Sequence, residues 1–176
     1  MKKLVAMATF ALCSSAMAAG ASTAPSFAGT YQYVGGNAEK DALSSAVETV
    51  VHRMNFFFRG IARGRLKKSN QPSAELTLAI DRGAITVVRT GQQTVSAPAN
   101  GQPIKVRLDG DDFQVAHGFD GARLYQTFLG PKSFSRNDLA LSPDGNTLTV
   151  FTHIESRYFP IPLDFHMTYR KVTTGP

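Results

Sequence analysis

Residues 163–170 read Leu-Asp-Phe-His-Met-Thr-Tyr-Arg, and apolar and polar side chains alternate along them without exception. Because successive side chains of a β-strand point to opposite faces of a sheet, this alternation predicts a strand with one buried and one exposed face. Residues 148–154 carry a similar pattern just upstream. Matching the apolar faces of the two runs predicts that they are neighbouring antiparallel strands.

The pattern of short strands continues upstream as far as Pro72. We predict strands in this part of the chain over residues 74–80, 84–89, 104–108, 113–117 and 122–129. Turn signals lie between many of them, and each places a glycine where a tight turn needs a positive φ. These signals are Asp81-Arg82-Gly83, Asp109-Gly110, Asp120-Gly121 and Pro143-Asp144-Gly145.

The N-terminal part of the fold changes period. Residues 27–34 alternate and are closed by Gly35-Gly36, which predicts a first strand. From about Asn37, apolar residues recur at steps of three and four, which is typical of one amphipathic helix. The apolar stripe of this helix is Leu43, Val47, Val50, Met54, Phe57 and Ile61.

These elements predict a mainly β protein. An antiparallel up-and-down β-barrel of about eight to ten strands, with one N-terminal amphipathic helix after the first strand, leaves no sheet edge exposed. The helix is expected to cover one mouth of the barrel. A two-sheet sandwich is the alternative architecture.

The first 18 residues are typical of a secretory signal peptide. Lys2 and Lys3 are followed by an apolar run over residues 4–12, and Ala16-Met17-Ala18 provides small residues for cleavage. The apolar run is shorter than the roughly 20 residues that span a bilayer. We therefore expect a protein of the periplasm or the cell exterior.

The remaining chain divides simply. A lead-in over residues 19–26 is rich in small residues, and residues 27–176 form a single barrel domain. Cys13, the chain's one cysteine, lies within the predicted signal peptide. The mature protein is therefore expected to contain no disulfide.

Gly29-Thr30-Tyr31 near the start and Tyr169-Arg170 near the end resemble the ends of calycins, the group of lipocalins and fatty-acid-binding proteins. The chain is similar to a secreted bacterial member of that group. Calycins begin with a Gly-x-Trp strand and a helical segment, followed by a ligand-holding barrel. The resemblance implies a cavity for a hydrophobic ligand. It also implies that Arg170 packs over Tyr31 and closes the base of the barrel.

The predicted function is non-catalytic binding of a small hydrophobic or amphipathic molecule, without a cofactor or metal. The predicted ligand-binding side chains are Phe57, Phe128, Phe165, Met167 and Tyr169. A filled barrel that serves as an envelope or assembly partner through its surface is the alternative. No common signature of an enzyme active site occurs in the sequence, so no catalytic residue is assigned.

A second alternative concerns the exposed face of the last two predicted strands. Strand parity places His153, Asp164 and His166 together on that face. Two histidines and a carboxylate are ligands of transition metals, and they also form proton-transfer pairs. An enzyme or a metal site is therefore possible at this place.

Basic residues gather at the end of the predicted helix. The chain has a net charge of +6, and this cluster is expected to contact an anionic membrane surface through Arg59, Arg63, Arg65, Lys67 and Lys68. Beside it, Phe56-Phe57-Phe58 points in three directions on a helix, so at least one ring must leave the buried stripe. Nucleic-acid binding is not expected, because aromatic residues are not interleaved with the basic ones.

Overall fold

The computed structural model describes residues 26–108 and 110–172. The predicted signal peptide, residues 1–18, lies outside them, as does the lead-in apart from Ser26. The elements are β1 (Gly29–Tyr33), α1 (Gly36–His52), the 3-10 turn η1 (Phe56–Phe58), α2 (Arg59–Ser69), β2 (Glu75–Asp81), β3 (Ala84–Arg89), β4 (Val95–Pro98), β5 (Ile104–Leu108), β6 (Asp111–Asp120), β7 (Arg123–Leu129), β8 (Ser133–Leu141), β9 (Thr147–Ser156) and β10 (Leu163–Lys171).

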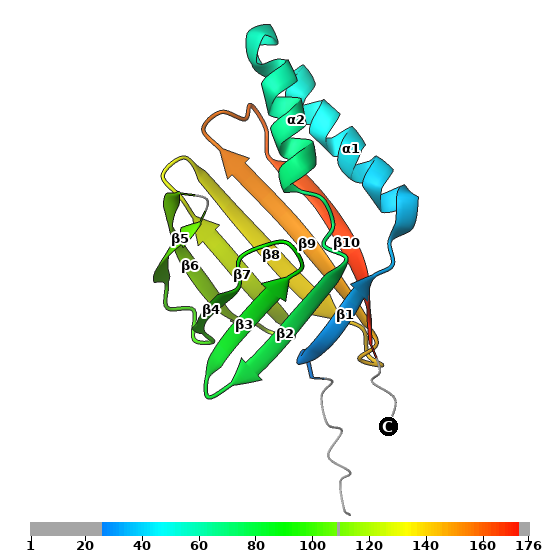
Figure 1. Ribbon diagram of the computed structural model, residues 1–176, viewed down its shortest axis with the longest axis vertical. Helices are drawn as coiled ribbons and strands as arrows, with labels where there is room; N and C mark the ends of the chain where they lie inside the picture. The colour runs from blue at the N-terminus through cyan, green and yellow to red at the C-terminus, as the bar shows by residue number, and fades with distance from the viewer. Residues whose placement is uncertain (1–25, 109, 173–176) are drawn as a thin grey trace, which may run out of the picture.

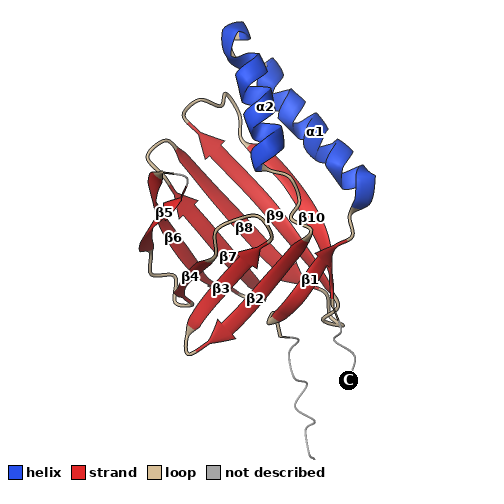
Figure 2. Cartoon of the chain, viewed as in Figure 1, coloured by secondary structure: helices blue, strands red, loops and turns tan. Residues whose placement is uncertain are grey.

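Ten strands form one antiparallel sheet that curls into a nearly closed barrel (Figures 1 and 2). The strand order is β4-β3-β2-β1-β10-β9-β8-β7-β6-β5, so strands consecutive in the chain pair with each other except β4 and β5, which form the two edges, and β1 pairs with β10. This arrangement confirms the predicted up-and-down barrel and excludes the sandwich.

One edge strand of the sheet, β4, lies against β6, which pairs with the other edge strand β5, and His117 of β6 ties this seam together. The main-chain N–H of Gly101, just after β4, donates to the carbonyl of His117 on β6 at 2.9 Å. The imidazole Nδ1 of His117 lies 2.8 Å from the carbonyl oxygen of Ile85 on β3. Both bonds cross from one side of the seam to the other, and the His117 side chain is fully buried.

The register of β9 and β10 agrees with the matched apolar faces of the sequence. Leu163 pairs with Ile154, Met167 with Val150, and Tyr169 with Leu148. On the opposite face, Asp164 pairs with His153, His166 with Phe151, and Arg170 with Thr147. The first set faces the barrel interior, where Leu148, Leu163, Met167 and Tyr169 are buried.

The single helix expected from the sequence is two helices. The stripe holds through α1, whose buried residues are Leu43, Val47, Val50 and Val51 and which packs against β10. The chain leaves α1 after His52. Asn55, whose ψ is 134°, then begins η1, and its side chain accepts a hydrogen bond from the main-chain N–H of Phe57. This turn starts α2 in a new direction, so Phe57 and Ile61 do not continue the buried stripe.

The two helices form a hairpin at one end of the barrel, with the α1–α2 turn projecting beyond the strands (Figure 1). Glu48 of α1 holds them together through ion pairs with Arg63 and Lys67 of α2, at 2.9 and 3.0 Å. These cations lower the pKa of Glu48 to about 2. Within the described residues, neither helix is long and apolar enough to cross a membrane.

Candidate ligand-binding cavity

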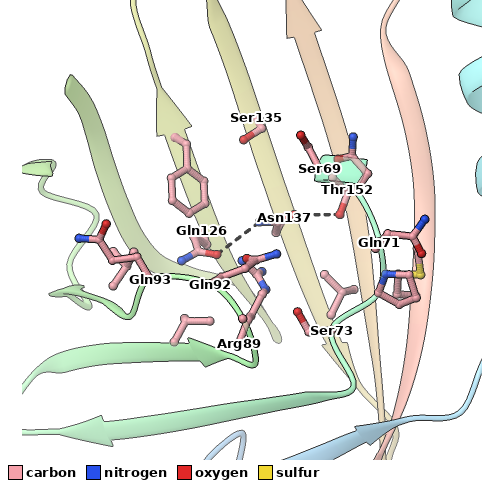
Figure 3. Close-up of a pocket in the computed structure, with 18 of the residues that line it drawn as sticks. Ser69, Gln71, Ser73, Arg89, Gln92, Gln93, Gln126, Ser135, Asn137 and Thr152 are labelled. Carbon is pink, nitrogen blue, oxygen red and sulfur yellow. Dashed lines mark hydrogen bonds between the residues drawn. The ribbon is translucent and has the colours of Figure 1, made fainter. Parts of the chain in front are cut away.

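The barrel encloses a cavity of about 970 Å³, partly drawn in Figure 3. Side chains of β3 to β10 line it, and so does the segment that joins α2 to β2. The cavity reaches a rim formed by the β3–β4 loop and the start of β6. Its volume lies at the upper end of the range of small-molecule sites.

One part of the cavity wall is apolar. The structure places four of the five predicted ligand-binding side chains in it, namely Phe128, Phe165, Met167 and Tyr169. The lining also includes Val87, Val95, Phe113, Val150 and Ile154. These residues come from the inward faces of several strands, as the alternation in the sequence predicts.

The fifth predicted residue, Phe57, does not line the cavity. It lies on η1 at the tip of the helical hairpin, and 83% of its surface is exposed. The turn at Asn55 carries Phe57 away from the barrel, so the expectation that it contacts a ligand inside the cavity is corrected.

A second part of the wall is a chain of polar side chains from neighbouring strands. Gln126 Nε2 lies 2.8 Å from His117 Nε2, and Asn137 Nδ2 donates to Gln126 Oε1 at 3.3 Å. The Thr152 hydroxyl donates to Asn137 Oδ1 at 2.8 Å (Figure 3). Three of these residues, Gln126, Asn137 and Thr152, line the cavity, and His117 lies buried behind them.

His117 fixes the direction of this chain. The carbonyl of Ile85 can only accept, so Nδ1 carries a proton and, in a neutral ring, Nε2 must accept. Burial lowers the pKa of His117, and the nearby Arg89 charge lowers it further, so the ring is neutral near pH 7. Gln126 therefore donates an N–H to the ring and accepts through its oxygen. Asn137 in turn donates an N–H to Gln126 and accepts through its own oxygen.

Arg89 brings a positive charge into the cavity. It ends β3 opposite the buried Leu76, and its half-buried side chain forms part of the lining. Burial lowers the pKa of its guanidinium, although the adjacent Tyr169 works in the opposite direction. Among the described residues, Asp111 at the rim is the one carboxylate in the lining, and no ion pair includes Arg89.

The predicted barrel-closing pair is not formed. Tyr31 faces the interior and is fully buried, whereas Arg170 is exposed on the outer face opposite Gln32. The neighbouring residue, Lys171, takes the predicted place, with Nζ 5.6 Å from the centre of the Tyr31 ring. Since Tyr31 and Lys171 are direct cross-strand partners, they share a face that Arg170 cannot reach.

The exposed histidine cluster is only partly assembled. His153 Nδ1 lies 2.6 Å from Asp164 Oδ1, and its Nε2 lies 3.1 Å from Glu155 Oε1. Hydrogen bonds to Glu155 and Asp164 raise the pKa of His153. His166 turns instead to Glu39 of α1, at 3.7 Å. In the described part of the chain, no three His, Cys, Asp or Glu side chains are placed to hold a metal ion.

Three of the five residues in the predicted basic patch make contacts within the helical hairpin. Arg63 and Lys67 pair with Glu48, and Arg59 donates to the carbonyls of His52 and Met54, so these three also stabilise the hairpin. The adjoining tip exposes four apolar side chains: Phe56 at 75%, Phe57 at 83%, Phe58 at 60% and Ile61 at 63%.

The polar half of the site does not follow from the alternation in the sequence. Asn137 and Gln126 are buried on strands whose inward positions mix polar and apolar residues, so alternation alone gives no signal. Arg89 ends a predicted strand, but the prediction does not say which face of the sheet its side chain lies on. Counting inward from Val87, which shares its parity, was the signal that places Arg89 inside.

No protein-family model matches the chain, and no curated protein matches its sequence significantly. Solved structures share its fold. A secretory abundant heat soluble protein from Ramazzottius varieornatus aligns with a TM-score of 0.56 and 8% identity, over 85% of this chain and 100% of that chain.

Two fatty-acid-binding proteins give similar alignments. Protein 1 of Echinococcus granulosus has a TM-score of 0.51 and 14% identity, over 84% of this chain and 98% of that chain. The protein isolated from Manduca sexta has a TM-score of 0.50 and 17% identity, over 84% and 100%. These likenesses confirm that the chain has a calycin-like barrel fold.

Proposed function

We propose that the protein is a non-catalytic carrier of a small amphipathic molecule with an anionic head group. The observation behind this proposal is Arg89, a half-buried cation in the lining of a cavity of about 970 Å³ whose other wall is apolar. A charge partly removed from water is costly unless a partner compensates it. A carboxylate at Arg89 supplies that partner, while the aliphatic part of the ligand covers Phe128, Phe165 and Met167.

The cavity favours a ligand over the filled-barrel alternative, in which side chains occupy the interior. The similar solved structures also support a ligand, since two of them are fatty-acid-binding proteins. The half-buried Arg89 also favours an anion over an uncharged lipid, because a neutral ligand leaves the guanidinium without a counter-charge.

Displacement of a fluorescent fatty acid by hexadecanoate tests this proposal. We expect saturable binding to the wild type and a loss of roughly tenfold or more in Arg89→Gln, since a charged hydrogen bond contributes about 1.5–3 kcal/mol. Arg170→Gln, on the outer face, is the matched control and is expected to bind normally. Equal affinity of all three proteins, or no saturable binding at all, contradicts the proposal.

We also propose that the protein is exported and that the helical hairpin contacts anionic membranes. Export follows from the signal-like residues 1–18, and the intact mass of the exported protein should correspond to a chain that starts near Ala19 without lipid. A start at Met1, or a lipid adduct on Cys13, contradicts this.

For membrane contact, the exposed rings Phe56, Phe57 and Phe58 lie beside a helix without acidic residues in its first turn. Such a surface suits the lipid interface, where aromatic rings insert and cations attract anionic head groups. We expect co-sedimentation with vesicles of phosphatidylcholine plus phosphatidylglycerol, weakened when the three rings are changed to serine. A Lys105→Gln control on β5 should bind as the wild type does, and unchanged binding of the serine variant contradicts the assignment.

A further inference from the structure

The polar chain in the cavity wall determines which groups a ligand can satisfy there. The Thr152 hydroxyl donates its hydrogen bond to Asn137. Toward a group in the cavity, the Thr152 oxygen can therefore only accept. Gln126 and Asn137 each use one N–H in the chain, and no second partner for either nitrogen is found among the described residues. The wall therefore presents an acceptor beside free donors.

A hydroxyl is the small group that suits both. It donates to the Thr152 oxygen and accepts from an amide N–H of Asn137, whose Oδ1 lies 2.8 Å from Thr152 Oγ1. A ketone accepts but cannot donate, and a methylene does neither. Because polar groups left unpaired in a closed site are costly, sites of this kind discriminate strongly against analogues that lack the matching group.

We infer that the cavity selects, among amphipathic anions, those whose apolar chain carries a hydroxyl group that binds Thr152 and Asn137. This inference rests on the proposed carrier function, in which Arg89 takes the head group. Thr152 is then a specificity-determining residue. His117 is a positioning residue, since it makes Gln126 and Asn137 donate toward the ring and thereby fixes Thr152 as an acceptor.

Three kinds of 16-carbon probe separate these contributions: hexadecanoate, a series of hydroxyhexadecanoates with the hydroxyl at successive positions, and the matching oxohexadecanoates. In titration calorimetry, we expect at least one hydroxy isomer to bind the wild type about five- to tenfold more tightly than both hexadecanoate and its oxo counterpart. The position of the best isomer reports the distance along the chain from Arg89 to Thr152.

Variants of Thr152 assign the effect to this residue. Thr152→Val keeps the shape but removes the acceptor, so the preference for the hydroxy isomer should fall to about onefold while hexadecanoate still binds. Thr152→Ser retains a hydroxyl and should retain the preference. Ser135→Ala is the matched control, because Ser135 lines the cavity but takes no part in the chain, and it should keep the wild-type preference.

Four results overturn the inference. Equal binding of hexadecanoate and every hydroxy isomer by the wild type removes the hydroxyl preference but leaves the carrier function standing. No saturable binding of any probe removes both. A preference that survives in Thr152→Val, or tighter binding of the oxo form, shows that the polar chain is not what reads the ligand.

Discussion

Replacement of His117 by leucine is expected to open the seam of the barrel. The imidazole is fully buried and makes hydrogen bonds to Ile85 on β3 and Gln126 on β7. Leucine fills a similar volume but leaves one carbonyl and one amide N–H without a partner. Each buried polar group left unpaired costs about 1–3 kcal/mol, so the free energy of unfolding should fall by about 2–6 kcal/mol.

Urea unfolding followed by far-ultraviolet circular dichroism measures this loss. For a domain of this size, each kcal/mol lowers Tm by roughly 2–4 °C, so we expect a drop of about 5–20 °C. His166→Leu is the control, since its side chain is 52% exposed and its change should stay within about 0.5 kcal/mol. If His117→Leu is no less stable than this control, the seam does not depend on His117.

The same histidine predicts a pH dependence of stability. Its pKa is lowered in the folded state, so below about 6.5 the unfolded chain binds more protons than the native protein does. Stability should therefore fall as the pH decreases through this range. His117→Leu should abolish the part of the pH dependence of stability that is due to this residue. An unchanged pH dependence contradicts the conclusion that the His117 ring is neutral and fixes the direction of the hydrogen bonds.

The other predictions concern three separate contacts. Glu48→Gln should lower Tm by a few degrees at most, because the ion pair with Arg63 is lost. It should also remove the stability that the wild type loses as the pH falls from 4.5 toward about 2, and an acid unfolding profile identical to that of the wild type contradicts this. His153→Gln should remove less than about 1 kcal/mol of the free energy of unfolding, and only at low pH. The raised pKa of His153 means that the protonated ring stabilises the fold below about pH 6.5 and that this stability is lost as the pH rises. A loss of stability confined to high pH contradicts this direction of the pKa shift. Gly118→Ala places a Cβ 2.6 Å from the Tyr125 hydroxyl oxygen and should cost about 1–3 kcal/mol in urea unfolding, whereas wild-type stability shows that Tyr125 can move aside.

The strands with clean alternation could be predicted because burial on one face imposes a period of two. Residues 163–170 predict β10 and, by matching apolar faces, its antiparallel pairing with β9, to which the structure adds the register. Strand β4 has only four residues, too few for a period of two to stand out, and β8 lacks a clean apolar period. On β8 the inward residues include Asn137 as well as Leu139, so the apolar period is broken where the cavity needs polar groups.

The errors at the helix and at the barrel base have local causes. A periodic stripe does not show that the helix ends at His52, before Asn55 stabilises a turn through its side-chain hydrogen bond. The Tyr31–Arg170 pair was taken from a resemblance, and the observed partner, Lys171, is one residue further along β10. A shift of one position moves a side chain to the other face of a strand.

Hexadecanoate labelled with carbon-13 at its carboxyl group tests the central claim most directly, because its NMR shift reports the charge of the bound head group. If Arg89 binds the carboxylate, the pKa of the bound carboxyl should lie below that of the free acid and should rise in Arg89→Gln. A bound carboxyl whose pKa is raised, or is the same in the wild type and Arg89→Gln, contradicts the assignment of Arg89 as the head-group site.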